Sequence, residues 1–296
     1  MNRVELIVPA MLLLAMGAGS AIADDDSVQG IEARVAKIEG LAGPEAVHWD
    51  AEQNLWFISN FNGDAAGDAN GFISRASSDG QLLELEFMVG TEDHPLHGPR
   101  GMRIDGERLW VADADGLHAF DRRSGDHLEF LDFSSFEPGF LNDVEIGPDG
   151  ALYLTDTGAT RLFRIAEGEI SVVASDELTS PPNGVVWSAR ADALILAPWG
   201  GGLAFDAYRP EQHELVAGPT LPAGGNIDGL ELWKGGLLAA SQADQAIWFV
   251  LEDQAEILIR TPGRPADIGL DASGGRIAVP YIALDRVDIW RLPDAN

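Results

Sequence analysis

Short apolar runs separated by polar turns recur along almost the whole chain. A unit holds an apolar run, a turn rich in Asp, Gly or Asn, and a second apolar run, as in NDVEIGPDGALYLTD at 142–156 and DGLELWKGGLLAAS at 228–241. Runs of this length and composition predict strands, and the turns between them predict tight hairpins. One or two further strand-like runs follow each hairpin, such as GFISRAS at 71–77.

Six such units follow one another, and each first run opens at a polar residue. These residues lie 39 to 55 positions apart: Glu45, Arg100, Asn142, Asn183, Asp228 and Asp267. Four short strands per unit, repeated six times, predict an all-β fold, a six-bladed β-propeller of four-stranded blades. The segment 31–40 precedes the first unit, and the last unit has no outer strand of its own. We therefore expect this N-terminal strand to complete the last blade and close the ring.

The first 23 residues differ from the rest. An apolar run at 6–18 follows Arg3, and a small-x-small sequence ends at Ala23. This pattern predicts a signal peptide over 1–23, with a single propeller domain over 24–296. A membrane anchor is the alternative, although the run is short for a span and is broken by Pro9. The chain contains no cysteine, so an exported protein of this kind points to a bacterial periplasm or a secreted location.

The charge balance limits the partners. The chain carries 48 acidic and 19 basic residues, for a formal net charge of -29. Such a surface repels nucleic acid and anionic lipid and attracts cations. We expect a monomer with a small-molecule substrate, no nucleic-acid partner, and no membrane span after signal cleavage.

In a propeller the first strand of each blade lines the central channel, so the six opening residues should ring one end of it. Glu45, Asn142, Asn183 and Asp228 would then offer two carboxylates and two amide carbonyls. These hard oxygens suit one divalent cation, with Ca²⁺ first and Mg²⁺, Mn²⁺ or Zn²⁺ as alternatives. The competing interpretation is that these residues only cap strands and form turns.

Further polar and aromatic residues are expected on the same face. Arg100 would bind an anionic or carbonyl oxygen of a ligand, or balance surplus carboxylate charge. Asp267 would be an ion-pair partner or a substrate contact, and Trp199 would stand at the rim. His97, in EDHPLHGPR at 92–100, would serve as a general base; a solvated loop histidine is the alternative.

GPEAVHWDAEQNLWF at 43–57, PNGVVWSARADALIL at 182–196 and the two units quoted above resemble the SMP-30/gluconolactonase/LRE-like family. The resemblance covers residues 40–292. It implies a six-bladed propeller with one central divalent cation on Glu45, Asn142, Asn183 and Asp228, with Asp228 also acting as acid/base. Sugar-lactone members carry an arginine where this chain has Phe140. This difference favours a less polar substrate, unless Arg100 takes the place of the missing arginine.

Together these features predict an exported, divalent-metal-dependent hydrolase of the lactonase or esterase type, in which the metal polarises a carbonyl oxygen. The alternative is a non-catalytic binding propeller of the NHL type, with a structural metal or none.

Overall fold

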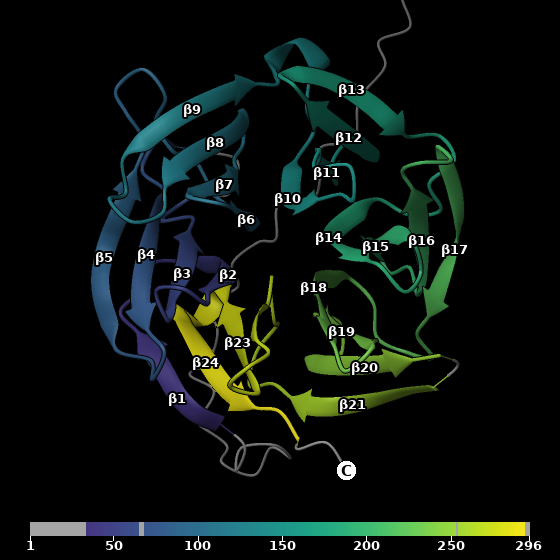
Figure 1. Cartoon of the computed structure of the whole chain (residues 1–296). Helices are drawn as coiled ribbons and strands as arrows, with labels where there is room; N and C mark the ends of the chain where they lie inside the picture. Colours follow the sequence, from purple (N-terminus) through teal and green to yellow (C-terminus); the bar gives the residue numbers. More distant parts are fainter. Residues whose placement is uncertain (1–33, 65–67, 253, 294–296) are drawn as a thin grey trace, which may run out of the picture.

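Six four-stranded antiparallel sheets stand around a common axis in the computed structural model, as Figure 1 shows. The structure describes residues 34–64, 68–252 and 254–293. The segment 1–23 that the sequence assigns to a signal peptide lies outside the described residues. The predicted six-bladed propeller is confirmed.

Each blade contributes one strand to each of four concentric positions. The innermost strands are β2 (Pro44–Asp50), β6 (Met102–Asp105), β10 (Leu141–Ile146), β14 (Pro182–Ser188), β18 (Ile227–Trp233) and β22 (Gly269–Asp271). The second strands are β3 (Leu55–Asn60), β7 (Arg108–Ala112), β11 (Leu152–Asp156), β15 (Ala193–Pro198), β19 (Gly236–Ser241) and β23 (Arg276–Tyr281).

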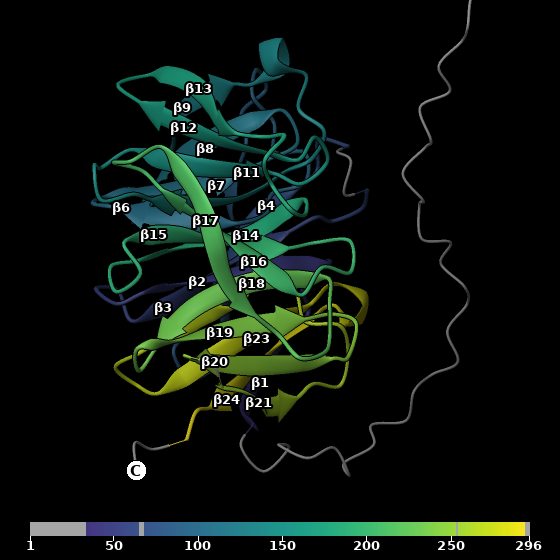
Figure 2. The ribbon, with the colours of Figure 1, turned by 90° about the vertical axis from the view of Figure 1, so that its right-hand side faces the viewer.

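The outer half of each blade is more exposed. The third strands are β4 (Phe72–Ser77), β8 (Gly116–Asp121), β12 (Arg161–Ala166), β16 (Ala204–Arg209), β20 (Ala246–Leu251) and β24 (Arg286–Arg291). The outermost strands are β5 (Leu82–Val89), β9 (His127–Asp132), β13 (Glu169–Ala174), β17 (Glu214–Thr220), β21 (Gln254–Arg260) and β1 (Arg34–Glu39). Two short 3-10 turns, η2 (Ser134–Phe136) and η3 (Ile282–Leu284), complete the elements. In the edge view of Figure 2, β17 crosses the front of the ring.

The first and last described strands close the ring. β1 pairs antiparallel with β24, with Lys37 opposite Asp288 and Glu39 opposite Arg286. The sequence placed residues 31–40 in this position, and the pairing confirms it. The closure satisfies a sheet edge that the last blade would otherwise expose.

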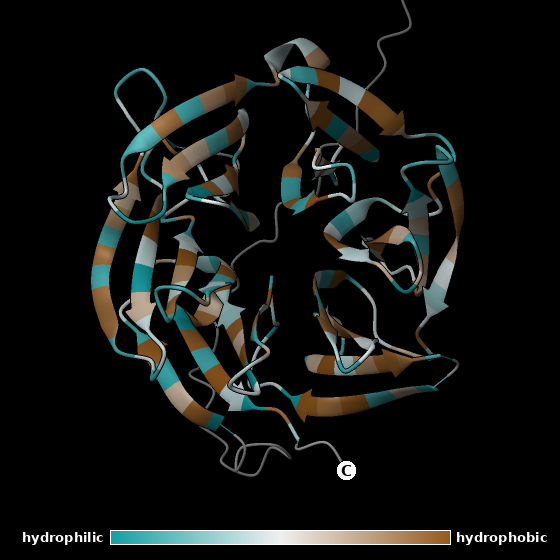
Figure 3. Ribbon diagram, in the orientation of Figure 1, coloured by the Kyte–Doolittle hydropathy of each residue, from teal (hydrophilic) through white to brown (hydrophobic). Residues whose placement is uncertain are grey.

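Apolar side chains fill the spaces between neighbouring blades. One such cluster joins Trp110 of β7 to Leu154 and Phe163 of the next blade. The outermost strands alternate between apolar and polar residues (Figure 3), because only one of their faces packs inward. Within the described residues, no helix is long and apolar enough to cross a membrane.

Candidate metal centre at the ring axis

The four residues predicted to hold a metal share one backbone irregularity. In the first blade Pro44 pairs with Asn60 and Val47 with Ile58, so a step of three residues on β2 matches a step of two on β3. The same one-residue bulge follows Leu141 on β10, Pro182 on β14 and Ile227 on β18. A bulge of this kind re-aims the side chains within it. Glu45, Asn142, Asn183 and Asp228 each occupy its first position.

The register also shifts beside Arg100 and Asp267, although their strands, β6 and β22, begin two residues after them. The Arg100 N–H donates to the Ala112 carbonyl at 2.8 Å, whereas the Ala112 N–H donates to the Gly101 carbonyl at 3.0 Å. The backbone N–H of Asp267 donates to the Glu45 carbonyl at 2.9 Å, and its carbonyl accepts from Val47 at 3.1 Å, which bonds the last blade to the first. The six opening residues are all buried.

Two glycines let the inner strands approach one another at this level. A Cβ on Gly184 would lie 2.3 Å from the Asp228 carbonyl oxygen, and a Cβ on Gly229 would lie 2.3 Å from Oδ1 of Asp267. Both contacts are far shorter than a carbon can tolerate. The glycine after Asn183 and the glycine after Asp228 are thus needed to bring adjacent blades together around the axis.

Three oxygens of the predicted ligand set are buried without a hydrogen-bond partner among the described residues: Oε2 of Glu45, Oδ1 of Asn183 and Oδ1 of Asp228. Leaving such atoms unpaired costs about 1–3 kcal/mol each. The amide of Asn142 donates through Nδ2 to the Thr157 hydroxyl at 3.0 Å, which leaves its carbonyl oxygen as the remaining polar atom. This donor set fits a hard divalent cation.

Burial and mutual repulsion raise the pKa values of the axial carboxylic acids. Burial raises the pKa of Asp228 to about 7, with Asp143 adding to the rise and a Gln242 hydrogen bond opposing it. The pKa of Glu45 lies well above its usual range because of burial and the nearby Asp228, although Arg100 lowers it. Asp267 is shifted in the same direction by burial, Asp143 and Glu45. A cation at the axis would relieve this repulsion by favouring the ionised forms.

A second group of charged residues, buried or half-buried, lies further along the inner strands. Three residues after the opening position stand Arg103, Glu145 and Glu231, and Arg103 forms an ion pair with Glu145. Burial raises the pKa of Glu231 to about 8, against the opposing effect of Arg103. His48, at the same position of the first blade, has its pKa lowered to about 3 by burial and by Arg103. These residues all lie three positions after the opening residue of their blade, and aligning the six units at that position could have revealed the group.

Asp143 was also missed from the sequence. Its Oδ2 accepts from the Val185 backbone at 2.8 Å and its Oδ1 from the Val144 backbone at 2.7 Å, which ties the third blade to the fourth. Burial raises its pKa to about 7. The position after each opening residue is otherwise Ala, Gly or Ile, so the lone acid at 143 was a visible signal.

The structure brings Arg100 and Phe140 together. The guanidinium carbon of Arg100 lies 3.8 Å from the Phe140 ring centroid and 5.7 Å from that of Phe61. The Asp156 carboxylate accepts the Phe140 backbone N–H at 2.8 Å and so holds the backbone at this residue. The sequence left open whether Arg100 could replace the arginine missing at residue 140. A guanidinium does stand against that residue, supplied by the second blade.

Trp199 and His97 make contacts of their own. Trp199 is half-buried and follows β15, with its backbone N–H bonded to the Pro181 carbonyl at 2.9 Å. His97 contacts two acids of the second blade: its backbone N–H donates to Asp113 at 2.7 Å, and its Nε2 lies 3.6 Å from Asp115.

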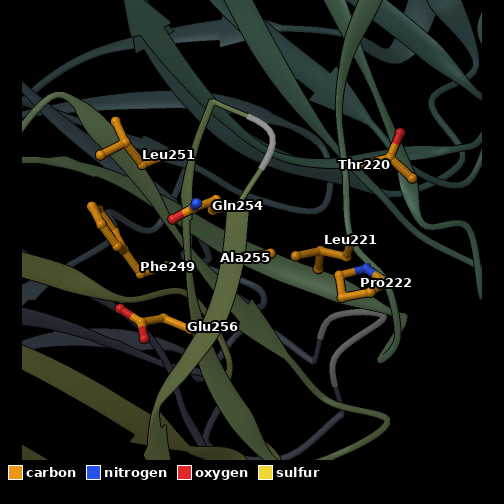
Figure 4. A pocket seen from close by; sticks show the side chains of 8 residues that line it. All are labelled: Thr220, Leu221, Pro222, Phe249, Leu251, Gln254, Ala255 and Glu256. Atoms are coloured by element: carbon orange, nitrogen blue, oxygen red, sulfur yellow. The ribbon is translucent and has the colours of Figure 1, made fainter.

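A cavity of about 700 Å³ lies away from the axis, on the outer side of the fourth and fifth blades. Figure 4 shows its lining: Thr220, Leu221, Pro222, Phe249, Leu251, Gln254, Ala255 and Glu256. The lining contains one carboxylate, that of Glu256, and therefore no pair of groups for acid–base catalysis. The candidate ligands and catalytic acids lie on the innermost strands instead.

No family matches the sequence, and no curated protein does. Solved structures with the same fold are numerous. A protein to which a gluconolactonase function has been ascribed superposes with a TM-score of 0.67 at 19% identity, covering 88% of this chain and 93% of the other. A gluconolactonase from Xanthomonas campestris gives 0.65 at 18% identity, with 90% and 93% covered.

Lyases have the fold as well. A virginiamycin B lyase from Staphylococcus aureus, solved with quinupristin, gives a TM-score of 0.60 at 16% identity, covering 87% of this chain and 99% of the other. At these identities the similarity establishes the fold that this chain shares with both groups of enzymes.

Proposed function

We propose that this chain is a divalent-metal-dependent hydrolase of the lactonase or esterase type. One cation, Ca²⁺ first, would be held by Glu45, Asn142, Asn183 and Asp228. The observation that supports the proposal is that Glu45, Asn142, Asn183 and Asp228 lie in equivalent bulges of four innermost strands, and that three of their buried oxygens lack hydrogen-bond partners among the described residues. A gluconolactonase among the structural neighbours supports the lactonase type of hydrolase.

The charges of the site fit such a cation. Two carboxylates balance a divalent ion, and two amide carbonyls complete a set of hard oxygens. When bound, the cation would polarise the substrate carbonyl and stabilise negative charge on its oxygen. Magnesium, manganese and zinc are the alternatives within the same proposal.

The chain's own residues supply the remaining chemistry. Asp228 would take a proton from water through a carboxylate oxygen, while Gln242 holds the other oxygen. Arg100, stacked on Phe140, would bind a carbonyl or anionic oxygen of the substrate. Phe140 and Trp199 would provide an apolar wall, and Asp267 a second acceptor next to Glu45.

The proposal is tested with protein stripped by EDTA and then given Ca²⁺, while melting temperature and hydrolysis are followed. The panel contains sugar lactones, aliphatic lactones, aryl esters and quinupristin. We expect Ca²⁺ to raise the melting temperature and to restore hydrolysis of a lactone or ester, with Asn183→Ala losing both effects.

Three outcomes contradict it. Full hydrolysis by metal-stripped Glu45→Ala protein would exclude the metal's role. Stabilisation by Ca²⁺ without turnover of any panel member would favour the non-catalytic binding propeller. Opening of quinupristin by elimination, identified by the mass of its linear product, would favour a lyase. Localisation in a bacterial periplasm or outside the cell belongs to the same proposal, and fractionation of cells expressing the full chain checks it.

A further inference from the structure

Away from the axis, the second blade gathers two carboxylates around a buried histidine. Asp113 and Asp115 lie in the connection between β7 and β8, and His118 lies in β8. Nε2 of His118 is 3.6 Å from Oδ2 of Asp113 and 3.8 Å from Oδ1 of Asp115. Within the described part of the chain, this is the one group of three His, Asp or Glu residues whose ligand atoms all lie within 4.8 Å of one another.

The histidine is the critical member of this group. Its side chain is 0% exposed, yet its Nε2 has no hydrogen-bond partner among the described residues, and neither does Oδ1 of Asp115. The other ring nitrogen, Nδ1, lies 3.1 Å from Nε2 of His127. Histidines that bind metals commonly use the second nitrogen in such a bond, which fixes the ring orientation. His118 thus presents a buried, unbonded nitrogen to two carboxylates.

The distances fit a small cation placed between these atoms. Metal–ligand bonds of 2.0–2.2 Å in tetrahedral geometry separate the ligand atoms by about 3.3–3.6 Å. The observed 3.6 Å and 3.8 Å separations are close to this value. The two carboxylates also stand in a partly apolar setting, where the Phe130 ring lies 4.7 Å from that of His118. A divalent cation would balance their charge.

A fourth ligand is adjacent. Nε2 of His97 lies 3.6 Å from Oδ2 of Asp115, and its side chain is 29% exposed, so it can adjust. Asp113 already holds the backbone of this segment, accepting from His97 at 2.7 Å and from Gly98 at 2.6 Å. A carboxylate oxygen has two lone pairs, so Oδ2 of Asp113 retains one for a metal.

We propose that His118, Asp113 and Asp115, with His97 as fourth ligand, form a second metal site for a divalent transition metal of the Zn²⁺ class. Imidazole nitrogens favour zinc and cobalt over calcium, so this site differs in chemistry from the oxygen set at the axis. A cation here fastens residues 97 and 98 to the second blade, and Arg100 follows two residues later. It therefore stabilises the segment that delivers Arg100 to the channel.

The experiment uses the full chain, stripped of metal and kept in excess Ca²⁺ to occupy the axis. Zn²⁺ binding is measured by equilibrium dialysis, and Co²⁺ binding by visible absorption. We expect one equivalent of Zn²⁺ and the intense visible bands of four-coordinate Co²⁺. Asp115→Asn and His97→Gln alter partly exposed side chains, so both should fold; each should lower Zn²⁺ affinity at least tenfold.

Matched controls separate this site from the axis and from general charge effects. Asp93→Asn changes an exposed acid in the same loop, and His213→Gln changes an exposed histidine of another blade; both should bind Zn²⁺ as the wild type does. Asn183→Ala should lose Ca²⁺ binding and keep Zn²⁺ binding.

The proposal is overturned if no Zn²⁺ binds in excess Ca²⁺, if Asp115→Asn and His97→Gln leave the Zn²⁺ affinity unchanged, or if Asn183→Ala abolishes Zn²⁺ binding.

Discussion

Gln242 donates through Nε2 to Oδ2 of Asp228 at 2.6 Å, while Oδ1 of the same carboxylate stays buried with no hydrogen-bond partner in the described part of the chain. One oxygen is thereby fixed in place and the other remains free for a ligand. The bond also opposes the rise in pKa that burial imposes on Asp228. Gln242 therefore acts as a positioning residue for the carboxylate.

Replacing this donor should move the pH dependence of metal binding. Gln242→Leu removes a hydrogen bond to the charged form, so the pKa of Asp228 rises further. Calcium requires the ionised carboxylate, and we expect the pH of half-maximal Ca²⁺ affinity to rise by about one unit. Isothermal titration between pH 5 and 9 measures it. Gln53→Leu removes a similar 2.8 Å bond to Asp50, at the far end of β2, and should leave the profile unchanged.

Removing the charge of Glu45 should have opposite effects on two quantities. At alkaline pH, where both acids are ionised, Glu45 and Asp228 repel each other in the metal-free protein, so Glu45→Gln should raise the melting temperature there. With Ca²⁺ present, the loss of one of two carboxylate ligands should lower affinity at least tenfold. Melting curves with EDTA and calorimetric titration provide the two measurements. Glu92→Gln, at an exposed position, is the control; a lower melting temperature for metal-free Glu45→Gln would indicate a structural role.

The buried acids should also make metal-free stability depend on pH. The pKa of Glu231 is about 8 in the folded state against a usual 4.5, so the folded state retains this proton at pH values where the unfolded state has lost it. Stability is therefore lost as pH rises toward 8. We expect the metal-free protein to be more stable at pH 7 than at pH 8.

The matched variant is Glu231→Gln, which cannot titrate. It should reduce the slope of unfolding free energy between pH 7 and 8 by about 1 kcal/mol per pH unit, as measured by urea unfolding. His48 acts in the opposite direction, since its pKa of about 3 removes stability as pH falls below 6.5. An unchanged slope would show that Glu231 is ionised in the folded protein.

The contact between Arg100 and Phe140 should affect substrate binding more than turnover. Phe140→Leu removes a cation–π contact worth about 0.5–2 kcal/mol. We expect KM for the best lactone or ester to rise about 2- to 30-fold while kcat stays within about twofold. Steady-state kinetics separate the two. Phe136→Leu, which alters a half-buried ring packed on Phe133 and Phe163, should leave KM unchanged.

The close approach at Gly184 predicts a stability effect. In Gly184→Ala the new carbon would meet the Asp228 carbonyl at 2.3 Å, and backbone cannot move aside cheaply. We expect a loss of about 1–3 kcal/mol together with weaker Ca²⁺ binding, because Asp228 is displaced. Gly202→Ala is the comparison, since its nearest atom is the Ser180 hydroxyl oxygen at 2.4 Å. That hydroxyl can rotate, so the same substitution should cost less.

The sequence alone determined the number of blades, their strand order and the closure of the ring by residues 31–40. These properties depend on local signals, namely short apolar runs and turns repeated at a regular interval. The register of the repeat also selected Glu45, Asn142, Asn183 and Asp228. Because each lies at the start of an equivalent strand, alignment of the units was enough to group them.

The tertiary structure decided what surrounds those four residues. The bond from Gln242 to Asp228 and the stacking of Arg100 on Phe140 both depend on contacts between separate segments of the chain. The group around His118 is local in sequence, since Asp113, Asp115 and His118 lie within six residues, but His97 and His127 reach it from other segments. The spacing of residues along the chain shows where each one lies in its own strand. Its hydrogen-bond and ring contacts with other strands are determined only when the blades pack around the axis.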